Sequence, residues 1–462
     1  MASLSRRKFV RTLTSGAAAA LALHQVHAAH PSAELLLPDW QTPAANDRIR
    51  IAAIGAGIMG FNNMRSSLQV PGVELAAVCD LYEGHLTRAK EVFGSHLITT
   101  RDYRELLSRT DIDAVLVSTS DHWHDRIAID ALMAGKHVYC EKPLVNDPQK
   151  GQALLDAEKK SGKILQTGSQ VVSSIATDKA RELYAAGAIG QLVMIETFND
   201  RDSAGGAWQY SIPTDASPQT VDWDRFLGSA PKMPFDKTRF FRWRNYKDYG
   251  TGAAGDLFVH LFSRFHRVTD SLGPERAYAT GGLHFWKDGR DVPDVIMALY
   301  DYPEAPTHPA FHVQMRVNFV AGGGGGYLVK LVGTEGMMLL EGDTIRLSNN
   351  GLFTTPTYGG WDSFDTFSLA EQQAFEAWYK KTYPNIAGSG MKGPGEQVFS
   401  APEGYSDHYH HHFNFYAAIR ANTRVVEDTA FGLRAAGPAL LANMSYFEKK
   451  VIRWDPKAIR VI

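Results

Sequence analysis

The chain has 462 residues, of which 44% are hydrophobic and 21% are charged, so it can bury a large core and form two or three globular domains. Its formal net charge is -2 and the basic residues form no stripe, so a nucleic acid partner is not expected. The two cysteines, Cys79 and Cys140, each end a predicted buried strand, which favours two small apolar thiols over a disulfide.

The N-terminal residues have the pattern of an export signal. Ser5-Arg-Arg-Lys-Phe-Val10 has the twin-arginine form, and an alanine-rich apolar run leads to a small-residue cleavage site near Ala28. The apolar run is shorter than a usual membrane-spanning helix, and a disordered basic N-terminus is the alternative interpretation. We therefore expect residues 1–28 to be a twin-arginine signal peptide and residues 29–47 a linker or arm. The mature protein would be periplasmic or secreted, exported in the folded state, with no membrane segment.

A glycine-rich turn follows the first predicted strand of the main body. The apolar run Ile51 to Ile54 leads into Gly55, Gly57 and Gly60, spaced G-x-G-x-x-G. In a βαβ unit the first glycine permits a tight turn, the second lets the backbone approach a pyrophosphate, and the third lets the helix pack on the strand. The free N–H groups of that helix would face the phosphates. The turn predicts a dinucleotide site.

An acid ends the second predicted strand, which spans residues 73–80. Asp80 follows Gly60 by 20 positions, where a carboxylate can accept hydrogen bonds from the adenosine ribose. The same carboxylate would repel a 2′-phosphate, so NAD is favoured over NADP. The alternative is a helix-capping Asp in an unrelated α/β protein.

Strands and helices alternate from residue 48 to about residue 170, which predicts an α/β fold with a doubly wound parallel sheet. Helices are expected over residues 102–108, 125–134 and 147–162, and strands over residues 114–119, 137–140 and 164–167. Gly135 and Gly162 are placed to end two of these helices, because glycine is the usual residue after a helix.

After residue 170 the pattern changes to consecutive strands, and residues 171–462 are expected to form an α/β domain with an open, largely antiparallel sheet. Strands are expected over residues 193–198, 294–302, 312–320, 328–332 and 337–340, and helices over residues 179–186, 414–420 and 431–449. The five glycines 322–326 should form a flexible loop between two strands. Residues 200–250 and an insertion at about 345–405 should be long irregular segments, which are often functional.

Glu141-Lys142-Pro143 follows the strand at residues 137–140, and ligands bind at the carboxyl ends of strands in such sheets. A lysine beside a nicotinamide can hydrogen-bond a substrate hydroxyl and help to transfer its proton. A surface salt bridge followed by a helix start is the alternative.

Asp256 and His260 lie four positions apart, so on a helix they would share one face. A histidine held by a carboxylate is a candidate general base for a hydroxyl that loses its proton as hydride leaves. A helix-capping Asp with a core His explains the spacing equally well.

Two groups of histidines are further candidates. His122 and His124, after Ser118-Thr119, should lie near the nicotinamide end of the cofactor and could bind phosphate, ribose or substrate, although one could simply begin a helix. Residues 407–412 hold four histidines, which could bind a metal. Adjacent residues on one short segment rarely converge on one ion, so a substrate-facing or solvated cluster is expected and no metal site is assigned.

Taken together, these motifs resemble the glucose–fructose oxidoreductase, inositol dehydrogenase and rhizopine-catabolism family (Gfo/Idh/MocA), in its exported bacterial branch, over residues 48–455. The marks are the glycine turn, Asp80, Asp121-His-Trp-His124, Glu141-Lys142-Pro143, Asp256 with His260, and the end from Val426-Glu-Asp428 to Trp454-Asp455. The resemblance implies a Rossmann domain at residues 48–170, then an α/β domain whose open sheet joins a homo-oligomer.

The resemblance also implies site residues. Lys142, Asp256 and His260 would be catalytic, with His260 the proton acceptor. The implied cofactor-binding residues are Gly55, Gly57, Ile58, Met59, Gly60, Asp80, Ser118, Thr119, His122, His124, Glu141, Lys142 and Gln170.

The expected function is an exported NAD(P)-dependent oxidoreductase that acts on a CH–OH group of a sugar or cyclitol, with tightly bound cofactor that the arm at residues 30–47 helps to cover. One alternative is a glycoside hydrolase or lyase that uses bound NAD for transient oxidation. The Thr-His-Gly run associated with that branch is missing, and Asp256 to His260 stands in its region. A non-catalytic sugar-binding protein is the other alternative, although such a protein needs no proton-transferring lysine or histidine.

Overall fold

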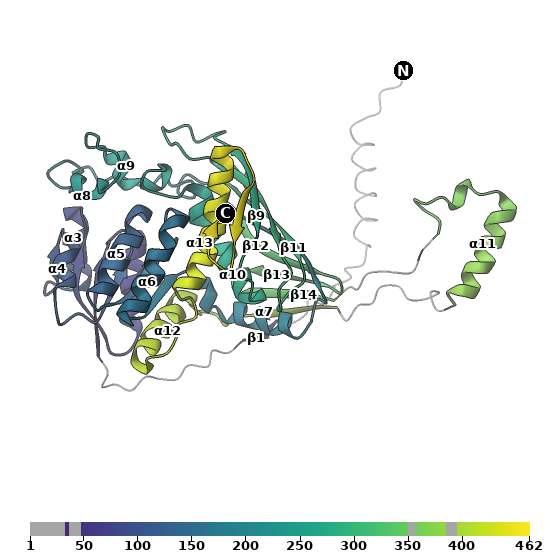
Figure 1. Cartoon of the computed structure of the whole chain (residues 1–462), viewed down its shortest axis with the longest axis horizontal. Helices are drawn as coiled ribbons and strands as arrows, with labels where there is room; N and C mark the ends of the chain where they lie inside the picture. Colours follow the sequence, from purple (N-terminus) through teal and green to yellow (C-terminus); the bar gives the residue numbers. More distant parts are fainter. Residues whose placement is uncertain (1–32, 37–47, 350–355, 357, 385–394) are drawn as a thin grey trace, which may run out of the picture.

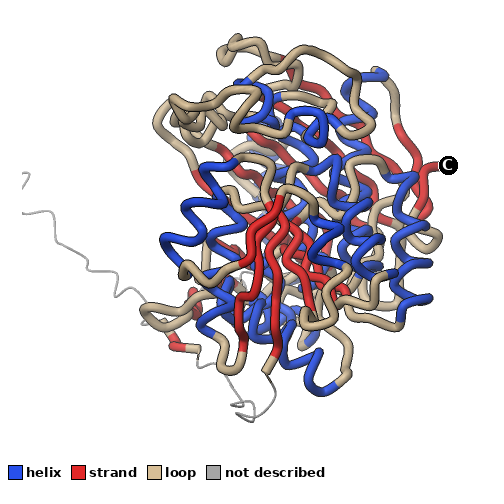
Figure 2. The backbone as a smooth tube through the Cα atoms, turned by 90° about the vertical axis from the view of Figure 1, so that its left-hand side faces the viewer, coloured by secondary structure: helices blue, strands red, loops and turns tan. Residues whose placement is uncertain are grey.

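The computed structural model describes residues 33–36, 48–349, 356, 358–384 and 395–462. Two sheets organise these residues, and the smaller sheet belongs to the N-terminal part of the described chain, on the left in Figure 1, which faces the viewer in Figure 2. Its six strands are all parallel, in the order β4-β3-β2-β5-β6-β7. The strands are β2 (Ile49–Ile54), β3 (Val73–Cys79), β4 (Ile98–Thr100), β5 (Ala114–Val117), β6 (His137–Glu141) and β7 (Leu165–Gly168). This confirms the predicted doubly wound sheet, with its order reversing beside β2.

Helices cover both faces of this sheet, which explains why most residues of β2, β3, β5, β6 and β7 are buried without alternating between a buried and an exposed face. The helices are α2 (Ile58–Gln69), α3 (Glu83–Phe93), α4 (Tyr103–Leu107), α5 (His124–Met133) and α6 (Gly151–Ser161). Gly162 ends α6 in the left-handed conformation, as expected. Cys79 and Cys140 are buried free thiols, which confirms the prediction that they form no disulfide.

The larger sheet has eleven strands in the order β1-β15-β14-β13-β12-β8-β11-β10-β9-β16-β17. Among the described strands of this sheet, the parallel pairs are β8 with β11 and β1 with β15 and the others are antiparallel, so the predicted largely antiparallel sheet is confirmed. The strands are β1 (Glu34–Leu35), β8 (Leu192–Asp200), β9 (Arg276–Gly282), β10 (Val295–Tyr302), β11 (Phe311–Asn318), β12 (Gly326–Gly333), β13 (Met337–Glu341), β14 (Thr344–Ser348), β15 (Glu396–Ser400), β16 (Ile452–Asp455) and β17 (Arg460–Val461).

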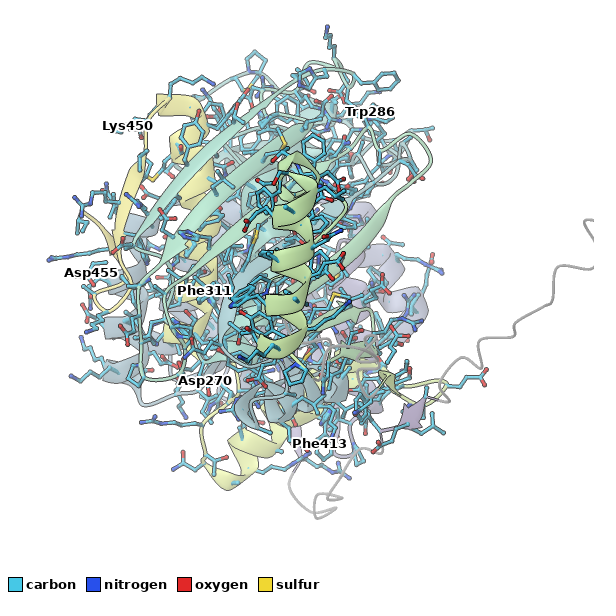
Figure 3. The ribbon with its side chains drawn as sticks, turned by 90° about the vertical axis from the view of Figure 1, so that its right-hand side faces the viewer. Asp270, Trp286, Phe311, Phe413, Lys450 and Asp455 are labelled. Carbon is cyan, nitrogen blue, oxygen red and sulfur yellow. The ribbon has the colours of Figure 1, made fainter. Side chains whose placement is uncertain are left out.

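Helices cover one face of the larger sheet. They are α7 (Ile175–Ala185), α10 (Val259–Thr269) and α13 (Thr429–Glu448), and their apolar residues join those of the strands in one core. In β10 the buried residues alternate with Met297 and Leu299, which are 47% and 57% exposed on the opposite face. Figure 3 looks at the molecule from the side of this sheet.

Helix α12 (Asp407–Ala421) begins seven residues before the predicted helix and so contains the histidine cluster. Ser406 accepts a hydrogen bond from the backbone N–H of Tyr409 and so caps the earlier start. The helix follows β15 of the larger sheet in the chain and packs against α2 of the Rossmann part; it is labelled in Figure 1.

Residues 200–250 form a segment that we call the cap, with the short helices α8 (Trp223–Leu227) and α9 (Lys237–Phe241). The cap lies above α3 to α5 in Figure 1. Its backbone bonds to the loop after β3, where Asp222 N–H donates to the Leu81 carbonyl at 2.8 Å. Its aromatic side chains form a separate small core with Tyr82.

The insertion at 345–405 is more regular than expected, because β14 and β15 add two strands to the larger sheet and α11 (Leu369–Thr382) lies between them in the chain. Helix α11 stands away from the two sheets (Figure 1), and its rings pack on Tyr358 and Phe364 nearby. The glycine run 322–326 lies between β11 and β12, as predicted, although Gly326 belongs to β12.

The arm expected to cover the cofactor is described only over residues 33–36, and the signal peptide lies outside the described residues. Strand β1 pairs with β15 at the edge of the larger sheet, and none of residues 33–36 lines the cavity between the Rossmann strands and residues 200–250. The described piece of the arm therefore does not cover the adenine side, which corrects that expectation for these residues. Within the described chain, no helix has the length and apolar character that a bilayer span requires.

Candidate active site

A cavity of about 480 Å³ lies between the carboxyl ends of the Rossmann strands and the cap. Its wall contains most of the predicted cofactor residues: Gly55, Gly57, Ile58, Met59, Asp80, Ser118, Thr119, His124, Glu141 and Lys142. The cap contributes aromatic and basic side chains to the opposite wall, among them Tyr210, Trp243 and Arg244. The strand order reverses beside β2, and this is where ligands bind in open α/β sheets.

The glycine turn has the geometry that the spacing predicts. Gly55 has a φ of 95°, and a Cβ there would lie 2.4 Å from the carbonyl oxygen of Ser118. A Cβ at Gly60 would lie 2.0 Å from the Gly55 oxygen, so only glycine allows α2 this close to the strand. A Cβ at Gly57 would meet no atom within 4 Å and would take up space in the cavity.

The N-terminus of α2 can hold a phosphate group. Gly57 caps the helix without a side-chain hydrogen bond, and the first turn has no acidic residue that would repel an anion. The free N–H groups of this turn and the space beside Gly57 fit a pyrophosphate. The residues present therefore fit a dinucleotide.

Asp80 lies where the adenosine ribose is expected, and its carboxylate is already held by the protein. Oδ2 accepts the Ala56 N–H at 2.6 Å, while Oδ1 accepts the Tyr82 N–H at 2.9 Å and lies 3.1 Å from Nδ1 of His85. Burial opposes its charge, but His85 and these N–H groups outweigh burial and lower the pKa of Asp80. The carboxylate is thus ionised and able to repel a 2′-phosphate.

Lys142 and Asp256 come from the two different parts of the chain and meet at the cavity. The Lys142 ammonium donates to the Asp256 carboxylate oxygen Oδ1 and to its backbone oxygen, both at 2.9 Å. Both side chains are less than 10% exposed. Despite burial, Lys142 and Arg244 lower the pKa of Asp256, so this carboxylate stays ionised.

Asp256 lies in a π-helical turn, Ala254–Phe258, immediately before α10. Such wide turns are frequent at functional sites. Within the described chain, hydrogen bonds to its carboxylate come from Lys142 and Arg244. The expected partnership with His260 is therefore not a hydrogen bond, because the lysine takes the place of the imidazole.

His260 is partly buried beside these charges at the start of α10. Burial and the neighbouring Lys142 ammonium lower its pKa well below the usual value. The imidazole is therefore neutral at physiological pH and has a lone pair that can accept a proton. Its role as proton acceptor stays a prediction.

The two histidines after β5 differ in position. His124 lines the cavity, with Nδ1 2.8 Å from the Pro143 carbonyl oxygen and Nε2 3.1 Å from that of Thr119. His122 has its ring nitrogens against the carbonyl oxygens of Phe226 and Tyr249 in the cap, and burial lowers its pKa to about 4. His122 thus attaches the cap to the Rossmann part and does not line the cavity. Of the two histidines, His124 is the one placed to contact phosphate, ribose or substrate.

A neighbouring carboxylate ties the same loop to the second part of the chain. Asp121 accepts hydrogen bonds from the backbone N–H and the hydroxyl of Thr251, at 2.9 and 2.7 Å. Thr251 leads directly into the turn that carries Asp256. This contact fixes the position of Asp256 relative to Lys142.

Glu141 is buried in the cavity wall and is held by two amides. Its Oε1 accepts from Asn63 Nδ2 at 2.9 Å and from Gln170 Nε2 at 3.0 Å. Gln170 also donates to the Tyr139 hydroxyl at 2.8 Å, so this predicted cofactor residue holds Glu141 and is not itself among the residues that line the cavity.

The histidine cluster extends this buried network. His412 has Nε2 3.2 Å from Asn63 Oδ1 and Nδ1 3.2 Å from Ser67 Oγ, and its ring stacks on Tyr139 with centroids 4.3 Å apart. His411 bonds to Ser173 and to the Thr167 carbonyl. Of the described residues, no three His, Cys, Asp or Glu side chains form a group that could hold a metal ion. The solvated or substrate-facing cluster expected from the sequence is wrong for His411 and His412, which are fully buried.

Sequence reasoning missed Arg244, Tyr210 and Asn63, which complete the site. Asn63 lies inside α2 with no motif of its own, and its role appears only through Glu141 and His412. Arg244 and Tyr210 lie in the cap, where the length of the irregular segment was the only signal for function.

Comparison with known proteins gives matches that centre on the Rossmann part. Residues 49–169 match the family model described as "Oxidoreductase family, NAD-binding Rossmann fold". The inositol 2-dehydrogenase of Salmonella paratyphi B is 30% identical over 175 residues, which cover 37% of this chain and 50% of the relative. The alpha-N-acetylgalactosaminidase of Shewanella oneidensis is 33% identical over 127 residues, 25% of this chain and 27% of that protein. The chain thus spans half or less of these relatives.

Solved structures match over most of the chain at low identity. A levoglucosan dehydrogenase in complex with NADH and levoglucosan has a TM-score of 0.61 at 18% identity, covering 88% of this chain and 99% of that one. An aldose-aldose oxidoreductase from Caulobacter crescentus has a TM-score of 0.62 at 15% identity, with 88% and 100% covered. These matches show that the two-part fold is shared. Residues 49–169 are the NAD-binding Rossmann domain of the Gfo/Idh/MocA oxidoreductase family.

Proposed function

We propose that the protein is an NAD-dependent oxidoreductase that acts on a CH–OH group of a sugar or cyclitol. The observation that carries the proposal is the Lys142–Asp256 pair. It is buried at the carboxyl end of β6, where the Rossmann domain meets the second part of the chain. A cofactor-binding domain alone needs no buried lysine held by a carboxylate from a helical turn of the second part of the chain. The relatives, an inositol 2-dehydrogenase and a levoglucosan dehydrogenase, support the substrate class.

NAD, when bound, supplies the acceptor for the hydride that leaves the substrate carbon. The hydroxyl on that carbon loses its proton as the carbonyl forms. The site must therefore hydrogen-bond the substrate oxygen and accept the proton that it releases. Lys142 is held by two hydrogen bonds and keeps one further N–H for a substrate oxygen. His260, kept neutral by burial and by Lys142, can accept the proton.

Substitution of the lysine tests this role. Lys142→Ala should lower kcat for NADH formation with an active sugar by roughly 100-fold or more, the usual size of a general acid–base effect. NAD affinity, measured by calorimetry, should stay within about threefold of the unchanged protein. Lys160→Ala, on an exposed position of α6, is the matched control. Near-normal turnover in Lys142→Ala would contradict the assignment.

A second candidate is a redox-assisted glycoside hydrolase, favoured by the 33% identity with an alpha-N-acetylgalactosaminidase over the Rossmann domain. Such an enzyme returns the hydride, so the sugar is cleaved with no net NADH. Simultaneous measurement of NADH absorbance and released aglycone separates the two functions.

The export of the protein and the retention of its cofactor belong to the same proposal. Export by the twin-arginine route would carry the folded protein, with NAD already bound, to a compartment where free NAD is scarce. Bound NAD would then have to be re-oxidised in place by a second substrate. Exhaustive dialysis of the pure protein, followed by mass spectrometry, should recover a dinucleotide. Free loss of NAD would rule out recycling of a bound cofactor.

We further propose that the outward face of the larger sheet joins two copies of the chain. Tyr278 and Leu299 pair across β9 and β10 and are 47% and 57% exposed, and Met297 lies beside them. Exposed apolar side chains clustered on one sheet face are typical of an interface. Analytical ultracentrifugation should show an oligomer for the unchanged protein and a smaller species for Leu299→Lys.

A further inference from the structure

Arg244 is a basic residue of the cap that lies against the Lys142–Asp256 pair. It lies in the short turn Trp243–Asn245 and lines the cavity, with Nε 3.4 Å from Oδ1 of Asp256. Its guanidinium carbon lies 4.2 Å from the centre of the Trp243 ring. A Cβ at Gly250 would lie 2.9 Å from the Arg244 Cα, so the chain packs closely behind it. The arginine is therefore held in one position before any ligand binds.

The two terminal nitrogens of Arg244 are its unused donors. Within the described chain, its one protein hydrogen bond is made by Nε, and the side chain is 21% exposed. The nearby Arg242 differs, because the Tyr210 carbonyl and the Gln209 side chain accept its hydrogen bonds. Arg244 thus presents a planar pair of N–H donors to the cavity.

Tyr210 adds another donor to the same wall. Its backbone carbonyl is held by Arg242 at 2.8 Å, and its side chain lines the cavity. Burial raises the pKa of its hydroxyl, so the phenol keeps its proton.

The carboxylates near this wall are occupied by protein donors. Asp256 binds Lys142, Asp121 binds Thr251, and Glu141 binds the amides of Asn63 and Gln170. This end of the cavity offers donors that match a planar anion.

We propose that the substrate is an acidic sugar, a uronic or aldonic acid, whose carboxylate is bound by the terminal nitrogens of Arg244. Guanidinium groups bind carboxylates through two parallel hydrogen bonds, a geometry that a neutral hydroxyl cannot satisfy. Because Arg244 and Lys142 share the Asp256 carboxylate, a bound carboxylate would bring a neighbouring CH–OH group to Lys142. This inference rests on the proposed function and narrows its substrate class.

Calorimetry on the full chain saturated with NADH tests the inference through binding alone, because the reduced cofactor cannot accept a hydride from the sugar. Glucuronate and galacturonate should bind at least about tenfold more tightly than glucose and galactose, since hydrogen bonds to charged groups are stronger than neutral ones. Arg244→Gln should weaken the acidic sugars by roughly 10- to 100-fold and change the neutral sugars less than about threefold. Arg244→Lys should recover part of the loss, because it keeps the charge without the planar pair.

Arg181→Gln is the control, because this arginine pairs with Asp270 on the surface. Three results would overturn the inference: equal or tighter binding of the neutral sugars, equal weakening of both classes in Arg244→Gln, or weaker NAD binding in that variant. The last result would place a cofactor phosphate on Arg244.

Turnover distinguishes this failure from failure of the proposed function. If acidic sugars bind through Arg244 but form no NADH, the substrate class stands and the oxidoreductase function fails. If neutral sugars alone bind and form NADH, the function stands and the acidic substrate class fails.

Discussion

The two walls of the cavity are assembled in different ways. The Rossmann wall comes from short segments in which motif and position coincide, so that Gly55, Gly57 and Asp80 follow directly from the ends of β2 and β3. The opposite wall comes from the cap, and behind it the π-helical turn with Asp256 contacts Lys142 and Arg244 and is held in place by long-range contacts. Cofactor binding therefore depends on local geometry, whereas substrate binding depends on how the two parts of the chain fit together.

Asp256→Asn should have the largest effect on the contact between the two parts of the chain. The change removes the carboxylate that neutralises Lys142 and Arg244, and loss of one partner of a buried ion pair costs about 3 kcal/mol or more of unfolding free energy. Activity should fall by roughly 100-fold or more, since Lys142 loses its charged partner and retains only neutral acceptors at this position. Urea unfolding and NADH formation measure the two effects.

Asp256→Glu, with the charge retained, should be less destabilised than Asp256→Asn. Equal stability of Asp256→Asn and the unchanged protein would mean that the two parts of the chain do not depend on this pair.

Substitution of two glycines in the same motif should affect different properties, stability for Gly60 and NAD affinity for Gly57. Gly60→Ala places a Cβ 2.0 Å from a backbone oxygen, so it should cost roughly 1–3 kcal/mol of stability. Gly57→Ala meets no atom, so stability should be unchanged while the methyl group obstructs the pyrophosphate and NAD affinity falls by about tenfold or more. Thermal unfolding and NAD titration check both variants, and an unstable Gly57→Ala would contradict the contrast.

His412→Leu should have a smaller effect and act across both parts of the chain. The imidazole supports Asn63, which positions Glu141 and Ser118, so its loss should lower kcat by several-fold to about tenfold while NAD still binds. His412→Gln, able to donate to Asn63, should recover part of kcat at the same stability loss. A fall in stability with unchanged kcat would make the histidine purely structural.

The sequence predicted the Rossmann domain closely, because its strands are apolar and its glycines mark turns through local geometry. The prediction failed where contacts join distant positions in the sequence. Asn63 and His412 are 349 residues apart, and no sequence motif links the two positions. The sequence predicts a substrate-facing or solvated histidine cluster because it does not show that Ser406 begins α12 early and that two of the histidines then face the Rossmann core. Arg244 lies in an irregular segment where no periodicity indicates which side chains face inward.

The smallest predicted effect concerns Asp80 and His85, at the adenosine end of the cavity. The pKa of Asp80 is lowered and that of His85 is raised by their contact, so both are charged between those two values. A raised histidine pKa contributes stability that is fully present below the unfolded value and is lost as pH rises through the folded value. The stability difference between the unchanged protein and His85→Gln should therefore shrink as pH rises from about 6 to about 9.

The difference should be at most about 1 kcal/mol, because His85 is 30% exposed and solvent screens the pair. Denaturant unfolding of both proteins across this range measures it. Lowering the pH through the depressed Asp80 value should abolish the same contribution from the acidic side, since the carboxylate then takes up a proton. A difference that stays constant or grows toward pH 9 would show that His85 acts through packing on Tyr82, whose ring lies 5.0 Å away, and not through its charge.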